Sequence, residues 1–178
     1  MVQILDTTLR EGEQTPGVYF DIHIKIAIVN LLNHIGIDYL EAGHPAVSDE
    51  ITNAVHRIAT MNIHVKIGTH ARTLATDIDQ ALCYQVSFLG IFYCVSNGRL
   101  QEVYRQPFTH AIKNITETIQ YARTQKQDLI IRYTPEDTVR TDFENVITAA
   151  QAAVEAGADI IDASILGLGE QAGIVDLT

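Results

Sequence analysis

The feature of this sequence that most constrains its fold is the alternation of short apolar runs with longer segments of helical periodicity. The apolar runs, which have the length and residue types of β-strands, cover residues 3–6, 37–41, 63–68, 86–95, 128–133 and 159–165. Between them, apolar residues recur every three or four positions, as in helices that pack one face on a sheet. Repeated strand–helix units of this kind predict an α/β fold with a parallel sheet and surrounding helices.

Three of the intervening segments predict a helix with one buried apolar face. The three predicted faces are Ile24, Ala27, Ile28, Leu31 and Ile35; Ile112, Ile115, Ile119 and Ala122; and Phe143, Val146, Ile147, Ala150 and Val154. Gly36 and Gly157 follow the first and third of these helices, at the position where a left-handed residue often ends a helix. The two junctions read alike, because an aspartate stands two residues after each glycine.

The composition favours a single folded domain that covers residues 1–178. Hydrophobic residues make up 47% of the chain and charged residues 19%, and no linker or low-complexity tract divides it. No apolar run reaches the ~18 residues of a membrane span, and the first residues lack the features of a signal peptide. Cys83 and Cys94 give no disulfide framework. We therefore expect a cytoplasmic protein with no membrane partner.

The charge balance excludes another class of partner. Twelve basic and 22 acidic residues give a formal net charge of −10. Nucleic acids attract basic surfaces, so we expect no nucleic-acid partner. A local basic pocket can still bind an anionic small molecule.

Two architectures fit the predicted elements: an open, doubly wound sheet and a (β/α) barrel. A full barrel has eight strands and usually takes ~250 residues, whereas this chain has 178 residues and six predicted strands. Length alone therefore favours the open sheet.

Polar residues that can carry chemistry follow the first predicted strand directly. The segment reads Asp6-Thr-Thr-Leu-Arg-Glu-Gly-Glu-Gln14, which places carboxylates, a guanidinium and an amide at the carboxyl end of a strand. Sites in α/β folds are built at such ends. On composition alone, however, a solvated loop with an internal Asp–Arg ion pair is the commoner interpretation.

The same segment resembles the signature of a known enzyme family. Leu9-Arg-Glu-Gly-Glu-Gln14, followed after ten residues by Lys25, resembles the DRE-type metal-dependent barrel family. That family includes homocitrate synthase, 2-isopropylmalate synthase, citramalate synthase and HMG-CoA lyases. Residues 39–45, 68–72, 131–142 and 162–173 resemble the ends of the family's second, third, fifth and eighth strands, in that order. The resemblance implies an incomplete (β/α) TIM-barrel-like fold with about six βα units instead of eight.

The resemblance also implies a reaction. Homocitrate and 2-isopropylmalate synthases condense acetyl-CoA with a 2-oxo acid by a metal-assisted Claisen reaction, in which Mg²⁺, Mn²⁺ or Zn²⁺ polarises the carbonyl group. The implied partners are therefore acetyl-CoA and a small 2-oxo acid. Thr69 and His70 favour homocitrate synthase, and the 2-isopropylmalate and citramalate synthases stay open as alternatives.

Individual residues match the family's functional positions. By this match, Asp6 is the metal ligand; Arg10 and Glu136 are catalytic; Gln14, Glu41, His70, Arg132 and Thr134 bind substrate; and Gly167, Gly169 and Glu170 bind cofactor. Two of these residues have an equally common structural interpretation. Arg132 would then form an ion pair with Glu136 or Asp137, and His70 would be a hydrogen-bonded core residue.

The sequence departs from the family pattern in its second half. It has seven histidines, and no two of them are separated by one residue, so the family's H-x-H metal motif is absent. Residues 141–156 lead directly into the run that resembles the eighth strand. The simplest explanation is an internal segment lost between two similar stretches that end in Glu-Ala-Gly-Ala-Asp.

This departure has structural and functional consequences. Six strands cannot reproduce the closure of an eight-stranded barrel, so we expect a homodimer or pairing with another chain to cover the sheet edges. Asp6 alone is a poor metal site. Three functions stay open: an acyl-CoA-dependent synthase, a non-catalytic module that binds a 2-oxo acid or a protein, and a remnant without function.

Overall fold

The computed structural model describes residues 2–163, which form two compact units. The first unit comprises residues 2–71 and 76–89, and the second comprises residues 72–75 and 90–163. No helix in residues 2–163 is long and apolar enough to cross a membrane.

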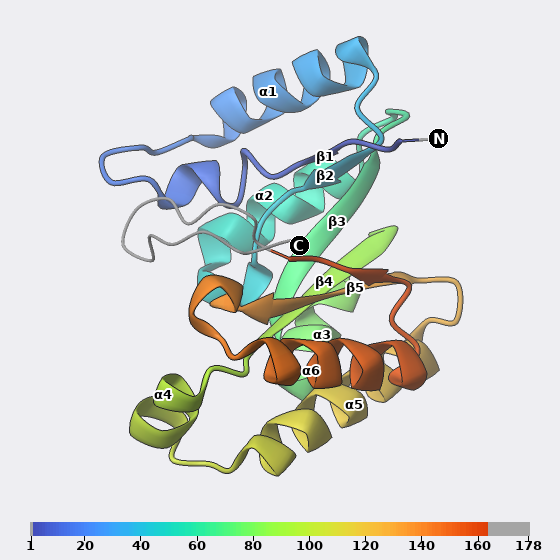
Figure 1. Ribbon diagram of the computed structural model, residues 1–178. Coiled ribbons are helices and arrows are strands. Elements are labelled where there is room, and N and C mark those ends of the chain that lie inside the picture. The colour runs from blue at the N-terminus through green and yellow to red at the C-terminus, as the bar shows by residue number, and fades with distance from the viewer. Residues whose placement is uncertain (1, 164–178) are drawn as a thin grey trace. The chain divides into compact units, whose positions relative to one another are not determined.

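Most of the first unit consists of alternating strands and helices (Figure 1). Its elements are strand β1 (Leu5–Asp6), the short turn η1 (Gly12–Gln14), helix α1 (Ile22–Ile35), strand β2 (Tyr39–Glu41), the turn η2 (Pro45–Val47), helix α2 (Asp49–Ala59), most of strand β3 (Lys66–Arg72), most of helix α3 (Ala75–Leu82) and the start of strand β4 (Phe88–Cys94). Its core is a cluster of buried apolar residues from the strands and from α1 and α2.

The second unit continues the same alternation. It contains the rest of β4, the short α4 (Asn97–Arg99), the π-helical turn η3 (Leu100–Tyr104), helix α5 (Phe108–Gln125), strand β5 (Ile130–Glu136), the turn η4 (Thr138–Arg140), helix α6 (Phe143–Ala156) and strand β6 (Ile160–Ile161). Helices α5 and α6 run side by side (Figure 1).

The order of the strands decides between the two architectures. The sheet order is β1-β2-β3-β4-β5-β6, the same as the order along the chain. Pairing is parallel, with Asp6 opposite Leu40 in β1–β2, Leu40 opposite Ile67 in β2–β3, and Tyr133 opposite Ile161 in β5–β6. A doubly wound sheet reverses its strand order at a switch point, whereas sequential order is the barrel pattern. The predicted parallel α/β fold is confirmed.

The two similar junctions have the same structure. Gly36 and Gly157 end α1 and α6 in the left-handed conformation, with φ of 81° and 111°. The aspartate two residues after each glycine accepts a hydrogen bond from a backbone N–H group in or next to a neighbouring strand. These bonds run from the Ile4 N–H to Asp38 Oδ2 at 2.7 Å and from the Ile131 N–H to Asp159 Oδ2 at 2.8 Å. The two junctions therefore have similar sequences because they form the same local structure.

The predicted buried face of α1 is wrong for most of its residues, although Ile28 does pack against the core. Lys25 and Val29 are the buried residues of this helix, whereas Leu31 and Ile35 are 65% and 68% exposed and Ile24 is also exposed. The helix has apolar residues on nearly every side, so their spacing does not single out one face. Burial of Lys25 follows from an ion pair that periodicity cannot reveal.

The other two predicted faces have mixed outcomes. In α5, Ile115, Ile119 and Ala122 are buried as predicted. In α6 the buried residues are the alanines 149, 153 and 156, and the predicted Phe143 and Val154 are exposed. Small side chains let α6 approach its neighbours closely, so the alanine stripe becomes the packing face instead of the larger residues.

Candidate functional site

Three of the predicted site residues converge in the first unit. Arg10 lies in the turn after β1, Glu41 is the last residue of β2, and His70 lies in β3. Arg10 Nε donates to Glu41 Oε2 at 2.5 Å, and His70 Nδ1 lies 3.4 Å from Glu41 Oε1. Glu41 and His70 are buried, and Arg10 is mostly so. We call these three residues the Arg10–Glu41–His70 cluster.

Local structure explains why these side chains meet. The Thr7 carbonyl accepts the N–H groups of Arg10 and Glu11, which closes a tight turn directly after β1. Parallel pairing sets Glu41, the last residue of β2, opposite Gly68 of β3, two residues before His70. Only glycine fits at position 68, because an added Cβ would lie 1.9 Å from the Phe88 ring. The close strand packing that this glycine permits holds the cluster in register.

The described residues do not fit a resident divalent ion. Within residues 2–163, no group of three or more His, Cys, Asp or Glu side chains is arranged to hold a metal. The carboxylate of Asp6 accepts bonds from the Thr8 N–H at 2.9 Å and from Thr8 Oγ1 at 3.1 Å. The role of Asp6 as a metal ligand stays a prediction.

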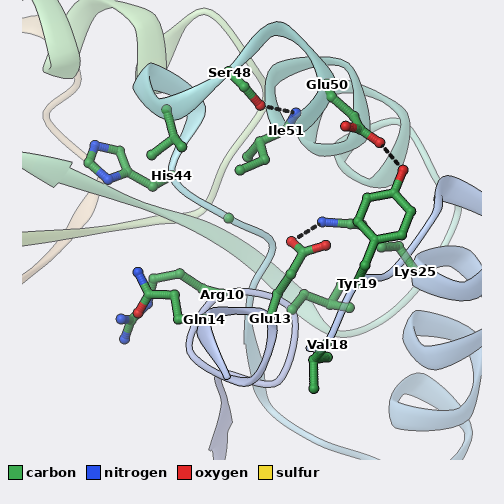
Figure 2. Close-up of a pocket in the computed structure, with 13 residues that line it drawn as sticks. Arg10, Glu13, Gln14, Val18, Tyr19, Lys25, His44, Ser48, Glu50 and Ile51 are labelled. Atoms are coloured by element: carbon green, nitrogen blue, oxygen red, sulfur yellow. Dashed lines mark hydrogen bonds and ion pairs between the residues drawn. The ribbon is translucent and has the colours of Figure 1, made fainter. Parts of the chain in front are cut away.

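A cavity of about 330 Å³ lies beside the cluster (Figure 2). Arg10 and the predicted substrate residue Gln14 line it, together with residues of η2 and the start of α2. Tyr19 hydrogen-bonds to Glu50 in this lining, and the bond to that carboxylate raises the pKa of the Tyr19 hydroxyl. The cavity belongs entirely to the first unit.

The signature lysine has a structural partner that sequence reasoning missed. Lys25 is buried in α1, and its Nζ donates to Glu13 Oε2 at 2.5 Å. The other oxygen of Glu13 accepts the Phe20 N–H at 3.1 Å. Glu13 therefore ties the turn that carries Arg10 and Gln14 to α1. The ten-residue spacing in the motif was the available signal.

His44 is a second residue that sequence reasoning left without a role. Its Nε2 lies 3.3 Å from Asp77 Oδ2, and its ring meets the His70 ring edge-on at 6.1 Å between centroids. Both His44 and Asp77 lie in the same unit as the cluster. They extend its network of buried polar side chains.

The predicted residues of β5 lie in the second unit. Thr134 Oγ1 donates to Asp162 Oδ2 at 3.2 Å, and Arg132 Nε lies 3.9 Å from the same oxygen. Glu136 Oε1 accepts from Arg99 Nη1 at 3.2 Å. Asp162 and Arg99 therefore join the candidate residues. Asp162 begins the segment that resembles the family's eighth strand, whereas no motif in the sequence pointed to Arg99.

The two acidic residues proposed as alternative partners of Arg132 form ion pairs with other arginines. Glu136 pairs with Arg99, and Asp137 Oδ1 accepts from Arg140 Nε at 2.7 Å. The ion pair with Asp137 raises the pKa of the Arg140 guanidinium. The predicted cofactor residues Gly167, Gly169 and Glu170 lie outside the described residues.

Comparison with solved structures identifies the fold. Hydroxymethylglutaryl-CoA lyase from Pseudomonas aeruginosa superposes on 94% of this chain and 59% of its own, with a TM-score of 0.75 and 18% identity. Together with the sequential strand order, this likeness places the chain in the class of (β/α) TIM-barrel-like proteins, with an incomplete barrel.

Sequence comparison identifies the family. Residues 1–152 match the HMGL-like family, and this chain belongs to it. It is 33% identical to homocitrate synthase from Pyrococcus horikoshii over 98% of this chain and 63% of that protein. It is 41% identical to homocitrate synthase from Saccharolobus solfataricus over 89% of this chain and 35% of that protein.

The chain spans between about a third and two thirds of the length of these relatives. The alignment with the Pyrococcus protein extends over 228 residues, but 98% of 178 residues is only about 174. About 54 positions of the relative, the difference between 228 and 174, therefore have no counterpart here. This gap supports the predicted loss of an internal segment.

Proposed function

We propose that this chain binds a 2-oxo acid of the 2-oxoglutarate class, as part of a homocitrate-synthase-type transfer of an acetyl group from acetyl-CoA. One observation carries the proposal: the Arg10–Glu41–His70 cluster, buried at the carboxyl ends of adjacent strands. The cluster lies within the residues that match the family. Identity to two homocitrate synthases supports this substrate class over the other 2-oxo acids.

Arg10 has the geometry of an anion-binding residue. Its Nε and Nη1 donate to Glu41 and Glu11, and among the described residues Nη2 has no acceptor. A guanidinium held in this way presents a fixed donor to a carboxylate or to an oxygen on which negative charge develops. Glu41 orients Arg10, and His70 supports Glu41 from the other side. We expect substrate to contact Arg10 directly.

A second candidate is the same binding site without turnover. The absence of an H-x-H motif from the sequence favours it, as does the lack of a three-ligand metal group within residues 2–163. A metal, when bound, would polarise the carbonyl of the oxo acid, but the described side chains do not supply its site. An assay for CoA release from acetyl-CoA and 2-oxoglutarate distinguishes a synthase from a binding module.

Calorimetric titration with 2-oxoglutarate tests the proposal. We expect Arg10→Ala to weaken binding by about 10- to 100-fold, because a hydrogen bond to a charged group contributes about 1.5–3 kcal/mol. Arg57→Ala is the matched control, since Arg57 is an exposed arginine of α2 in the same unit. Equal affinity of wild type and Arg10→Ala would show that the cluster is not the binding site.

A further inference from the structure

We propose that helix α1 is an interface between two copies of this chain, in which the exposed apolar side of one α1 packs on the same side of the other. Ile24 is 44% exposed, Leu31 is 65% exposed and Ile35 is 68% exposed. Their spacings of seven and four residues are close to two turns and one turn of helix, so the three side chains lie on one side of α1. We call these three residues the α1 stripe. Covering a row of apolar side chains removes it from water, which is favourable.

The α1 stripe lies on the side of the helix that points away from β3. Asn33 follows Ile24 by nine residues, or about two and a half turns, so its side chain leaves the helix on the opposite side. Asn33 Oδ1 accepts the N–H groups of His64 and Val65 at 2.8 and 3.2 Å, directly before β3. Because the sheet order begins β1-β2-β3, the stripe faces the β1 end of the sheet. In a closed (β/α) barrel another helix of the outer ring would pack there.

The exposed apolar surface continues from α1 to the segment that leads into β1. Val2 and Ile4 are 89% and 55% exposed. The Ile4 N–H donates to Asp38, which stands three residues beyond the end of α1 at Ile35, so this segment lies next to the C-terminal end of the stripe. β1 has one strand neighbour among the described residues. A second copy that covers the stripe would also shield this edge of the sheet.

The charges of α1 favour a second copy over a charged partner. Residues 22–35 contain one charged residue, Lys25, which is buried and paired with Glu13. His23 and His34 are exposed and count as neutral at pH 7. Helices α2, α5 and α6, in contrast, each carry exposed charged residues. An acidic or basic partner would therefore find no ion pair on α1.

An uncharged surface is also the one on which two copies can meet. Each chain has a formal net charge of −10, so two copies repel each other. This repulsion is smallest where neither contacting surface carries charge. The interface of a two-fold symmetric dimer must be complementary to itself, and an apolar row that meets an identical row satisfies this condition. Leu31 is the middle residue of the stripe, so it meets its own counterpart when the two helices run antiparallel.

The small size of the stripe predicts a weak, reversible dimer. It offers three apolar side chains per copy, and Val2 and Ile4 add two. Interfaces of less than ~1,200 Å² are typical of weak or transient complexes. We therefore expect the protein to be a monomer at about 1 μM and to associate as its concentration rises. Unfolding measured on dilute protein then reports the monomer, in which Leu31 is exposed.

Sedimentation velocity at pH 8, on protein between about 1 and 200 μM, tests the proposal. We expect the mass of wild type to rise from monomer to dimer over this range. Leu31→Glu should weaken the dimer by about tenfold or more, because it sets two like charges opposite each other. An equimolar mixture of Leu31→Glu and Leu31→Lys should associate again. Val103→Glu is the matched control, because Val103 is 63% exposed and lies in the second unit.

Each other outcome of this experiment overturns the proposal. Wild type that stays a monomer up to about 200 μM has no such interface. A dimer that forms equally well in Leu31→Glu is held elsewhere, for example by pairing of β1 edges alone. An equal effect of Val103→Glu would show that added charge, and not its position on α1, prevents association. A lower melting temperature of dilute Leu31→Glu, with no change in mass, would show that the chain itself covers the stripe.

Discussion

Buried charges in the first unit are held by specific partners, and these partners shape the candidate site. Glu41 lies between Arg10 and His70, and Glu13 neutralises Lys25. Burying a charge without a partner costs several kcal/mol. Each of these residues therefore constrains the others, and the turn that carries Arg10 is held from both ends.

The two cysteines show how burial changes the chemistry of one residue type. Cys94 is buried, which raises the pKa of its thiol, and the nearby Glu136 carboxylate acts in the same direction against the hydrogen bonds from Ser96. Because the thiolate is the reactive form, we predict that iodoacetamide at pH 8.5 modifies the exposed Cys83 and spares Cys94. Mass spectrometry of native and urea-unfolded protein reads out both sites. Equal modification of the two cysteines in native protein would refute the assignment.

At the scale of elements, the positions of the strands were predicted better than the buried faces of the helices. Within the described residues, a strand is present in each of the six predicted runs, although the bounds differ by a few residues. The end of the last predicted run, residues 164–165, lies outside the described residues. Strands that are buried on both sides read as continuous apolar runs, so the signal was strong. The faces of α1 and α6 were mispredicted because each helix has more apolar residues than one face can hold.

The residues of the candidate site were predictable only in part. The motif around Arg10 and the strand-end positions of Glu41 and His70 identified residues that meet in the structure. Glu13 and Arg99 were not predictable, because their roles depend on partners that are distant in sequence. The predicted functions of all these residues stay predictions.

The buried side of α1 can be tested directly with two residues of the same helix. Val29→Ala should lower the free energy of unfolding by about 2 kcal/mol, because Val29 is fully buried. Leu31→Ala should change it by no more than about 0.5 kcal/mol, because Leu31 is exposed. Urea denaturation measures both. A larger loss for Leu31→Ala than for Val29→Ala would restore the face that periodicity predicted.

At the scale of the whole molecule, this chain belongs to the HMGL-like family and spans 63% of the length of the homocitrate synthase from Pyrococcus horikoshii. β1 and β6 stand at the two ends of the strand order, and each has one strand neighbour among the described residues. Edge strands of this kind invite pairing. A homodimer or a complex with another chain therefore stays a prediction. Analytical ultracentrifugation of the purified protein measures the mass in solution and tests whether the chain forms a homodimer.

Titration of the protein with 2-oxoglutarate in EDTA, and again with Mn²⁺ or Zn²⁺, tests the proposed binding site most directly. The Arg10–Glu41–His70 cluster is the proposed binding site, and no three-ligand metal group lies within residues 2–163. We therefore expect 2-oxoglutarate to bind in EDTA, with an affinity that the metal leaves essentially unchanged. Binding that appears only when metal is present, or no binding in either condition, would contradict the proposed binding site.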